Sequence, residues 1–190
     1  MWQLLDCPVT ADIFIKNDLA IKSYLASTQH CIDYTDTLIQ FEKLTYAEKL
    51  LVSEERAYRF YPTKSTASNY GHALMDYRQE LAKIAETLQG SAHVDSLIEI
   101  QKEMIQLCEK ATQLTTLFPN QIENCAYVRI NYAVALSQKV NDVSDTELAS
   151  IYAIMKKQTL LAKETLEQLP NNFMVQYGLE QCKQILDYLE

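Results

Sequence analysis

The stretch PNQIENCAYVRINYAVAL, residues 119–136, decides the fold. Pro119 follows a large apolar residue and marks the end of one helix, while Asn120 and Glu123 have the spacing of a capping box that starts the next. The apolar residues fall on several helical faces: Val128, Tyr132, Ala135 and Leu136 on one, and Ala126, Ile130, Ala133 and Val134 on others. A helix that is apolar on more than one face is usually buried between layers. The sequence therefore predicts a buried helix over 120–140.

Two other prolines introduce similar segments. RAYRFYP ends at Pro62 and is followed by NYGHAL, and KETLEQLP ends at Pro170 and is followed by QYGLEQ. In each case a helix ends on an apolar residue and proline, and the next helix carries a tyrosine followed by glycine or alanine. A recurring unit of two helices is the mark of a helical solenoid.

The composition also favours helices, because only three of the 190 residues are glycine and four are proline. Apolar residues recur at spacings of three and four between the proline and glycine signals. Thr45 with Glu48 and Ser144 with Glu147 also have capping-box or near-capping-box spacing, which predicts helix starts there. We predict an all-α fold of about seven antiparallel helices stacked as helical hairpins. The predicted helices span 17–42, 45–61, 65–89, 93–118, 120–140, 145–169 and 171–189. We expect one domain, 1–190, with an N-terminal segment 1–16, hairpins 17–61, 65–118 and 120–169, and a terminal helix 171–189.

These features resemble the tetratricopeptide-repeat superfamily. Tyr132 lies thirteen residues after Pro119, where the family places a tyrosine of its first helix. Pro170 with the two asparagines that follow it looks like the family's repeat junction. The units here are longer than the family's 34 residues, and Cys125 and Arg129 stand where the family has tryptophan and glycine. The resemblance implies a right-handed solenoid, and an irregular helical bundle is the alternative.

The resemblance also implies a binding surface. In a tetratricopeptide-like stack the first helix of each pair lines a concave face where peptide or helix partners dock. The residues of this chain that would lie there are Asn69, His72, Asp76, Asn131, Val134 and Gln138, and less certainly Gln176, Leu179 and Lys183. Periodicity alone assigns these residues only to the face opposite the Tyr70, Leu74 and Tyr77 stripe, and plain solvent exposure or further core is the competing interpretation.

The charge balance limits the partners. The formal net charge is -8, which argues against nucleic acid and against an anionic membrane surface, because both require clustered Lys and Arg. It permits a basic protein partner. No phosphate-binding glycine motif and no His/Cys metal-ligand spacing occurs, so we expect no cofactor, no metal and no enzymatic activity. No run of about 18 apolar residues is present, so we expect no membrane-spanning helix.

We therefore expect a non-enzymatic module that binds a protein or peptide partner, as an adaptor, a secretion-chaperone-like protein or an immunity-type inhibitor. One alternative is a self-associating structural domain that forms a homodimer through 171–189, whose apolar surface is wide for an end helix. A small-ligand-binding or enzymatic helical bundle is the third.

The cysteines and glycines carry two further expectations. The five cysteines are odd in number and contain no C-x-x-C, so we expect reduced thiols in a cytoplasmic protein. Gly71 and Gly178 each follow a tyrosine inside a predicted helix, where glycine costs about 1 kcal/mol relative to alanine. We expect both glycines to be helical and to lie in van der Waals contact with a neighbouring element.

Overall fold

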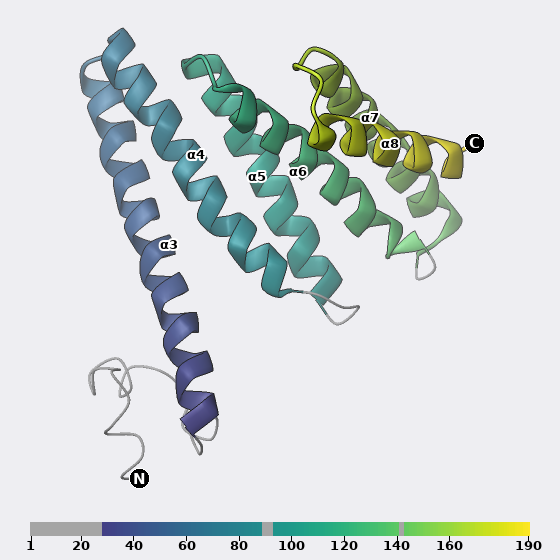
Figure 1. Ribbon diagram of the computed structural model, residues 1–190, viewed down its shortest axis with the longest axis horizontal. Coiled ribbons are helices and arrows are strands. Elements are labelled where there is room, and N and C mark those ends of the chain that lie inside the picture. The colour runs from purple at the N-terminus through teal and green to yellow at the C-terminus, as the bar shows by residue number, and fades with distance from the viewer. Residues whose placement is uncertain (1–27, 89–92, 141–142) are drawn as a thin grey trace. The chain divides into compact units, whose positions relative to one another are not determined.

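The computed structural model describes residues 28–88, 93–140 and 143–190, and these residues form helices and turns without a β-strand. The helices are α3 (Thr28–Phe60), α4 (Lys64–Thr87), α5 (Val94–Leu114), α6 (Pro119–Ser137), α7 (Asp145–Glu167) and α8 (Phe173–Tyr188), as Figure 1 shows. The predicted all-α class is confirmed. The described residues hold six helices and not about seven.

The difference in number arises in α3. The sequence predicts two helices, 17–42 and 45–61, but the described part of this region is one continuous helix, α3. The intervening residues, Lys43 to Thr45, include neither proline nor glycine, so nothing interrupts the helical hydrogen bonds there. Thr45 and Glu48 are therefore not a helix start. The predicted segment 1–16 and the predicted helix start at 17 lie outside the described residues.

The chain divides into two compact units, 1–48 and 49–190. The division falls inside α3 and not at a linker, so the expectation of a single domain stays a prediction. The described part of the first unit is the beginning of α3. The second unit holds the end of α3 and all of α4 to α8.

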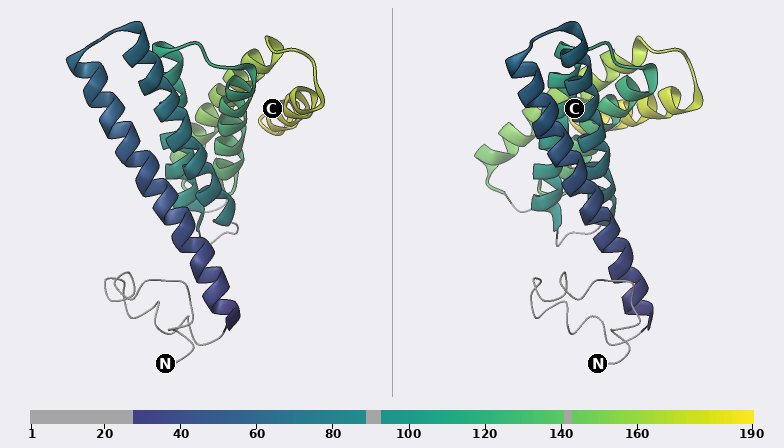
Figure 2. Two further views of the ribbon diagram at one scale, coloured as in Figure 1. Left: turned by 60° about the vertical axis from the view of Figure 1, so that its left-hand side comes forward. Right: turned by 90° about the vertical axis from the view of Figure 1, so that its left-hand side faces the viewer.

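Helices α4 to α8 run antiparallel, each to the next, and pack side by side (Figure 1). α4 packs on α5, α5 on α6, α6 on α7 and α7 on α8, and α6 also contacts α8. Figure 2 shows α4 and α8 at opposite ends of this series. The predicted hairpins 65–118 and 120–169 correspond to the pairs α4/α5 and α6/α7.

Helix α6 is buried on most sides, as its apolar pattern predicts. Its buried residues are Ala126, Val128, Ile130, Tyr132, Ala133, Ala135 and Leu136. On the side of α7 and α8, Ala126 and Ile130 form one core cluster with Leu166, Val175 and Cys182. Contact with three other helices explains why α6 carries apolar residues on several faces.

Of the two predicted capping boxes after residue 93, the one at α7 is present and the one at α6 is replaced by a neighbouring pair. The predicted capping box of Ser144 and Glu147 is present, because the Glu147 carboxylate accepts hydrogen bonds from the Ser144 N–H and hydroxyl. At α6 the helix begins at Pro119, and the Gln121 side chain accepts from the Phe118 N–H. The predicted pair Asn120 and Glu123 is therefore not the cap. Proline takes the first helical position because it needs no N–H partner there.

Both glycines mark places where elements approach closely, as predicted. Gly71 lies within α4 and Gly178 within α8. A β-carbon at position 71 would lie 2.5 Å from Thr115 Cγ2, and one at position 178 would lie 2.8 Å from Leu166 Cδ1. Neither site has room for a methyl group, and this offsets the cost of glycine within a helix.

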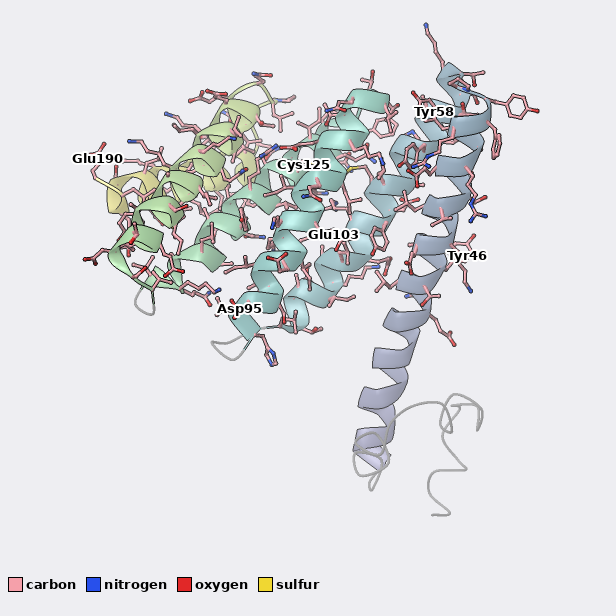
Figure 3. The ribbon with its side chains drawn as sticks, turned by 180° about the vertical axis from the view of Figure 1, so that it is seen from behind. Tyr46, Tyr58, Asp95, Glu103, Cys125 and Glu190 are labelled. Atoms are coloured by element: carbon pink, nitrogen blue, oxygen red, sulfur yellow. A yellow bond between two sulfur atoms is a disulfide. The ribbon has the colours of Figure 1, made fainter. Side chains whose placement is uncertain are left out.

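The expectation of reduced thiols is wrong for two cysteines. Cys108 of α5 and Cys125 of α6 form a disulfide, with 5.8 Å between their Cα atoms, and Figure 3 shows it beside the Cys125 label. Neighbouring helices bring together two residues that are 17 positions apart, and their spacing shows no motif. Cys182 is a buried free thiol, and burial raises its pKa to about 11. Disulfides are rare in reducing compartments, so the cytoplasmic assignment stays a prediction.

Reduction of this disulfide should lower the free energy of unfolding. The disulfide closes a loop between residues 17 positions apart and restricts the unfolded chain, which in the chain-entropy model contributes about 3 kcal/mol to the free energy of unfolding. Urea denaturation with and without dithiothreitol measures this difference. The Cys108→Ser/Cys125→Ser double variant should not respond to the reductant. Alkylation of both Cys108 and Cys125 in the native, unreduced chain would contradict the disulfide.

Gly71→Ala should destabilise the protein, although alanine is the better helix former. The added methyl would overlap the short, β-branched side chain of Thr115, and overpacking of this kind costs about 1–3 kcal/mol. Gly178→Ala is the parallel variant, and it should also destabilise the protein, because its β-carbon would lie 2.8 Å from Cδ1 of the fully buried Leu166 and 3.2 Å from the Tyr127 hydroxyl oxygen. Chemical denaturation of the two variants and the parent measures the difference. A Gly71→Ala protein as stable as the parent would refute the close approach.

Candidate functional site

The predicted binding residues divide into two groups in the structure. Asn131, Val134 and Gln138 of α6 line one pocket of about 720 Å³. Asn69, His72 and Asp76 of α4 do not line it. His72 instead stacks on Phe118, with 6.1 Å between ring centroids. Three of the six predicted residues therefore line this pocket and the three on α4 do not, and a role of any of them in partner binding stays a prediction.

One face of α6 supplies the largest share of this pocket, which we call the α4–α6 pocket. Its main contributors recur at spacings of three and four, so they lie on one side of the helix. They are Asn120, Asn124, Tyr127, Asn131, Val134 and Gln138. Four of these six side chains are amides, which donate and accept hydrogen bonds.

Helices α4 and α5 complete the pocket. The polar contributors from α4 are Arg78, Gln79, Lys83 and Glu86, and α5 supplies Leu97, Gln101 and Met104. Arg78 and Gln101 are buried, with 7% and 4% of their surface exposed. The Nε of Arg78 and the Oε1 of Gln101 have no hydrogen-bond partner among the described residues. Two residues of the pocket lining therefore each carry a buried polar atom that has no partner among the described residues.

A second pocket, of about 310 Å³, lies between α6, α7 and α8, and we call it the α6–α8 pocket. It is lined by Ala133, Val134, Ser137, Met155, Gln181, Gln184, Ile185 and Tyr188. Val134 borders both pockets and is 42% exposed. The two pockets therefore meet at Val134, on the exposed face of α6.

Tyr127, which lines the α4–α6 pocket, connects α6 to α8 by a hydrogen bond. Its hydroxyl donates to the backbone carbonyl of Met174, with 2.6 Å between the oxygens. Burial, and next the nearby Glu123 carboxylate, raise the pKa of the Tyr127 hydroxyl, so it remains a neutral donor at physiological pH. The start of α8 is thereby connected to the same face of α6 that lines the pocket.

Of the two cationic side chains that line the α4–α6 pocket, Lys83 has an ion-pair partner and Arg78 has none among the described residues. Lys83 pairs with Glu80, at 2.6 Å between Nζ and Oε1. Arg78 makes no ion pair with any described residue, and burial alone lowers the pKa of its guanidinium. Arg129, which does not line the pocket, contrasts with it, because Arg129 pairs with Glu109 at 2.8 Å and also donates to Gln158. Arg78 is thus the one buried guanidinium of the described chain without a counter-charge.

Sequence reasoning missed Arg78, Gln79, Gln101, Asn120 and Asn124. Two signals were present. Arg78 interrupts the apolar stripe of α4, four residues after Leu74 and three before Leu81, and a charge on a buried stripe calls for a partner. The amides of α6 recur at helical spacing. Only the packing of α4, α5 and α6, however, shows that these residues line one pocket.

Within the described residues, no three His, Cys, Asp or Glu side chains cluster closely enough to hold a metal ion. The pocket linings contain neither His nor Cys. Among the described helices, none combines the length and the apolar character needed to cross a bilayer.

Comparison of the chain with protein-family models, with curated proteins and with solved structures finds no match. The fold and the pockets are therefore the basis for a functional assignment.

Proposed function

We propose that this chain is a non-enzymatic interaction module that binds an extended peptide segment of a protein partner across α4, α6 and α8. The observation that carries the proposal is the meeting of the two pockets at Val134. A ligand that follows this face would leave the α4–α6 pocket, pass over Val134 and enter the α6–α8 pocket.

The chemistry of the lining supports a peptide. An extended peptide presents backbone N–H groups and carbonyls that require partners. Asn120, Asn124, Asn131 and Gln138 offer both kinds of group along one helix. Val134 and Ile185 provide apolar contact where the pockets meet. The pocket lining holds one carboxylate, Glu86, without a histidine or cysteine beside it, and this favours binding over general acid–base or nucleophilic catalysis.

The order of the helices agrees with the arrangement proposed from the sequence. In a tetratricopeptide-like stack, α4, α6 and α8 would be the first helices of successive pairs, and α5 and α7 the second. Both pockets are lined mainly by the former. This supports a solenoid-like interaction module, such as an adaptor, a secretion-chaperone-like protein or an immunity-type inhibitor.

Val134→Arg should block binding, because a long cation would occupy the junction of the two pockets. The probe is a displayed library of random 12-residue peptides, selected against the unmodified protein. Peptides so selected should bind Val134→Arg about tenfold more weakly or worse, a loss of roughly 1.4 kcal/mol, by fluorescence anisotropy. Leu160→Arg is the matched control, because Leu160 is 40% exposed and lines neither pocket. Failure to select any peptide, or equal binding by Val134→Arg, would refute the proposed function.

Self-association through α8 is the second candidate. The helix exposes Phe173, Met174, Tyr177 and Tyr188, and the rings of Phe173 and Tyr177 stack with 6.3 Å between their centroids. A terminal helix normally presents a polar outer face. Burial of these side chains against a second copy would remove apolar surface from water.

If α8 forms a dimer interface, light scattering should show a dimer at micromolar concentration. The Phe173→Ser/Tyr177→Ser variant should then be monomeric, because it loses the two stacked rings. Tyr61→Ser is the control, since Tyr61 is also highly exposed but lies in the turn before α4. A parent protein that is monomeric at high concentration would exclude this candidate.

A further inference from the structure

Arg78 is placed by the fold in a position that is unfavourable for the protein on its own. It lies on the apolar stripe of α4, where Leu74 and Leu81 are both buried. The residue as a whole is only 7% exposed, and it has no carboxylate partner among the described residues. Its Nε–H has no acceptor. A buried charge without a counter-charge or complete hydrogen bonding is strongly destabilising.

The lack of a carboxylate partner for Arg78 is unexpected in so acidic a chain, which has 25 Asp and Glu residues. The described residues carry many carboxylates, and other cations take them as partners, such as Arg59 with Glu55 and Arg129 with Glu109. Arg78 is the one buried cation of the described residues; it has no ion pair there, and it borders the α4–α6 pocket. A group that enters the pocket can supply the missing negative charge.

A carboxylate is the group that fits best. The guanidinium presents parallel N–H donors that match the two oxygens of a carboxylate. Gln101, also buried on the pocket, offers an unpartnered side-chain carbonyl, which requires an N–H donor. A peptide residue with an acidic side chain carries both groups, the carboxylate and its own backbone N–H. The pocket, at about 720 Å³, is larger than a lone anion requires and has room for several residues.

We propose that Arg78 is the buried anchor of the α4–α6 pocket and binds the side-chain carboxylate of an Asp or Glu in an extended acidic peptide. This inference rests on the proposed function and specifies its ligand. It differs from the expectation of a basic partner that follows from the net charge, because the pocket lining carries Arg78 and Lys83 against the single carboxylate of Glu86. The net charge of -8 describes the whole chain, whereas specificity arises at the contact.

The binding test uses two pools of synthetic 12-residue peptides in an Ala/Gly background. One pool carries Glu at two varied positions, and the other carries Gln at the same positions. We expect the Glu pool to bind the unmodified protein about tenfold more tightly by fluorescence anisotropy. Arg78→Met should remove the preference, and Arg78→Lys should retain part of it, because an ammonium cannot form the paired hydrogen bonds. Arg56→Met is the control, since Arg56 is exposed on α3 and lines neither pocket.

A stability measurement separates an anchor from a structural residue. Without ligand, Arg78→Met should raise the melting temperature, because an uncompensated buried charge is replaced by an apolar side chain of similar length. The Glu pool should raise the melting temperature of the unmodified protein and not that of the variant. A lower melting temperature for ligand-free Arg78→Met would show that Arg78 holds the fold together and would overturn the proposal.

A spectroscopic test does not depend on peptide binding. The chain has four arginines, so its side-chain Nε–H spectrum should contain four signals. Titration with acetate should shift the Arg78 signal selectively, and Arg78→Met identifies that signal by its loss. Inorganic phosphate is the comparison, and a response to phosphate alone would overturn the assignment of a carboxylate.

The outcomes distinguish this inference from the proposed function. Selection of peptides without a preference for Glu, with equal binding by Arg78→Met, overturns the inference and leaves the interaction module in place. A selective acetate response at Arg78 without any peptide binding supports the carboxylate site and refutes the peptide module. The absence of both responses refutes both proposals.

Discussion

The burial of α6 between α5, α7 and α8 is the constraint on which the rest of the second unit depends. Ala126, Ile130 and Ala133 are fully buried, and small side chains allow the neighbouring helices to approach. Because most faces of α6 are occupied by these neighbours, its exposed polar residues are confined to one strip. That strip carries the amides of the α4–α6 pocket. The polar pocket is therefore a consequence of how completely the other faces of the helix are covered.

Close approaches and cross-links then hold the walls of the pockets in place. Gly71 brings α4 against Thr115 at the end of α5, and Gly178 brings α8 against Tyr127 and Leu166. The disulfide of Cys108 and Cys125 joins α5 to α6, and the Tyr127 hydroxyl joins α6 to α8. These contacts restrain the helices that line both pockets, so the pockets are largely preformed. A preformed site loses less conformational entropy when a ligand binds.

The charged side chains of the second unit include two kinds: exposed ion pairs on the surface, and the buried Arg78. Exposed pairs such as Lys102 with Glu99 and Lys163 with Glu167 contribute little, since water and salt screen them. Arg78 differs because it is buried, unpaired and adjacent to a pocket. A protein that keeps such a charge gives up stability, and binding of an anionic group would recover it. The same balance is common at sites that are selected for function over stability.

The sequence by itself determined the all-α class, the ends of most helices and the burial of α6, because these follow from local periodicity, from proline and from capping residues. Periodicity placed Asn131, Val134 and Gln138 together on one face of α6, and the packing of α4, α5 and α6 made that face the lining of a pocket. The sequence could not determine that α3 is continuous past Thr45, since a capping pattern inside a helix differs from a real start only when a breaker accompanies it. The disulfide, the isolation of Arg78 and its place with Gln101 in the lining of one pocket were decided by the tertiary structure alone. Each depends on which residues of different helices face one another, and packing between helices sets this, not spacing along one helix.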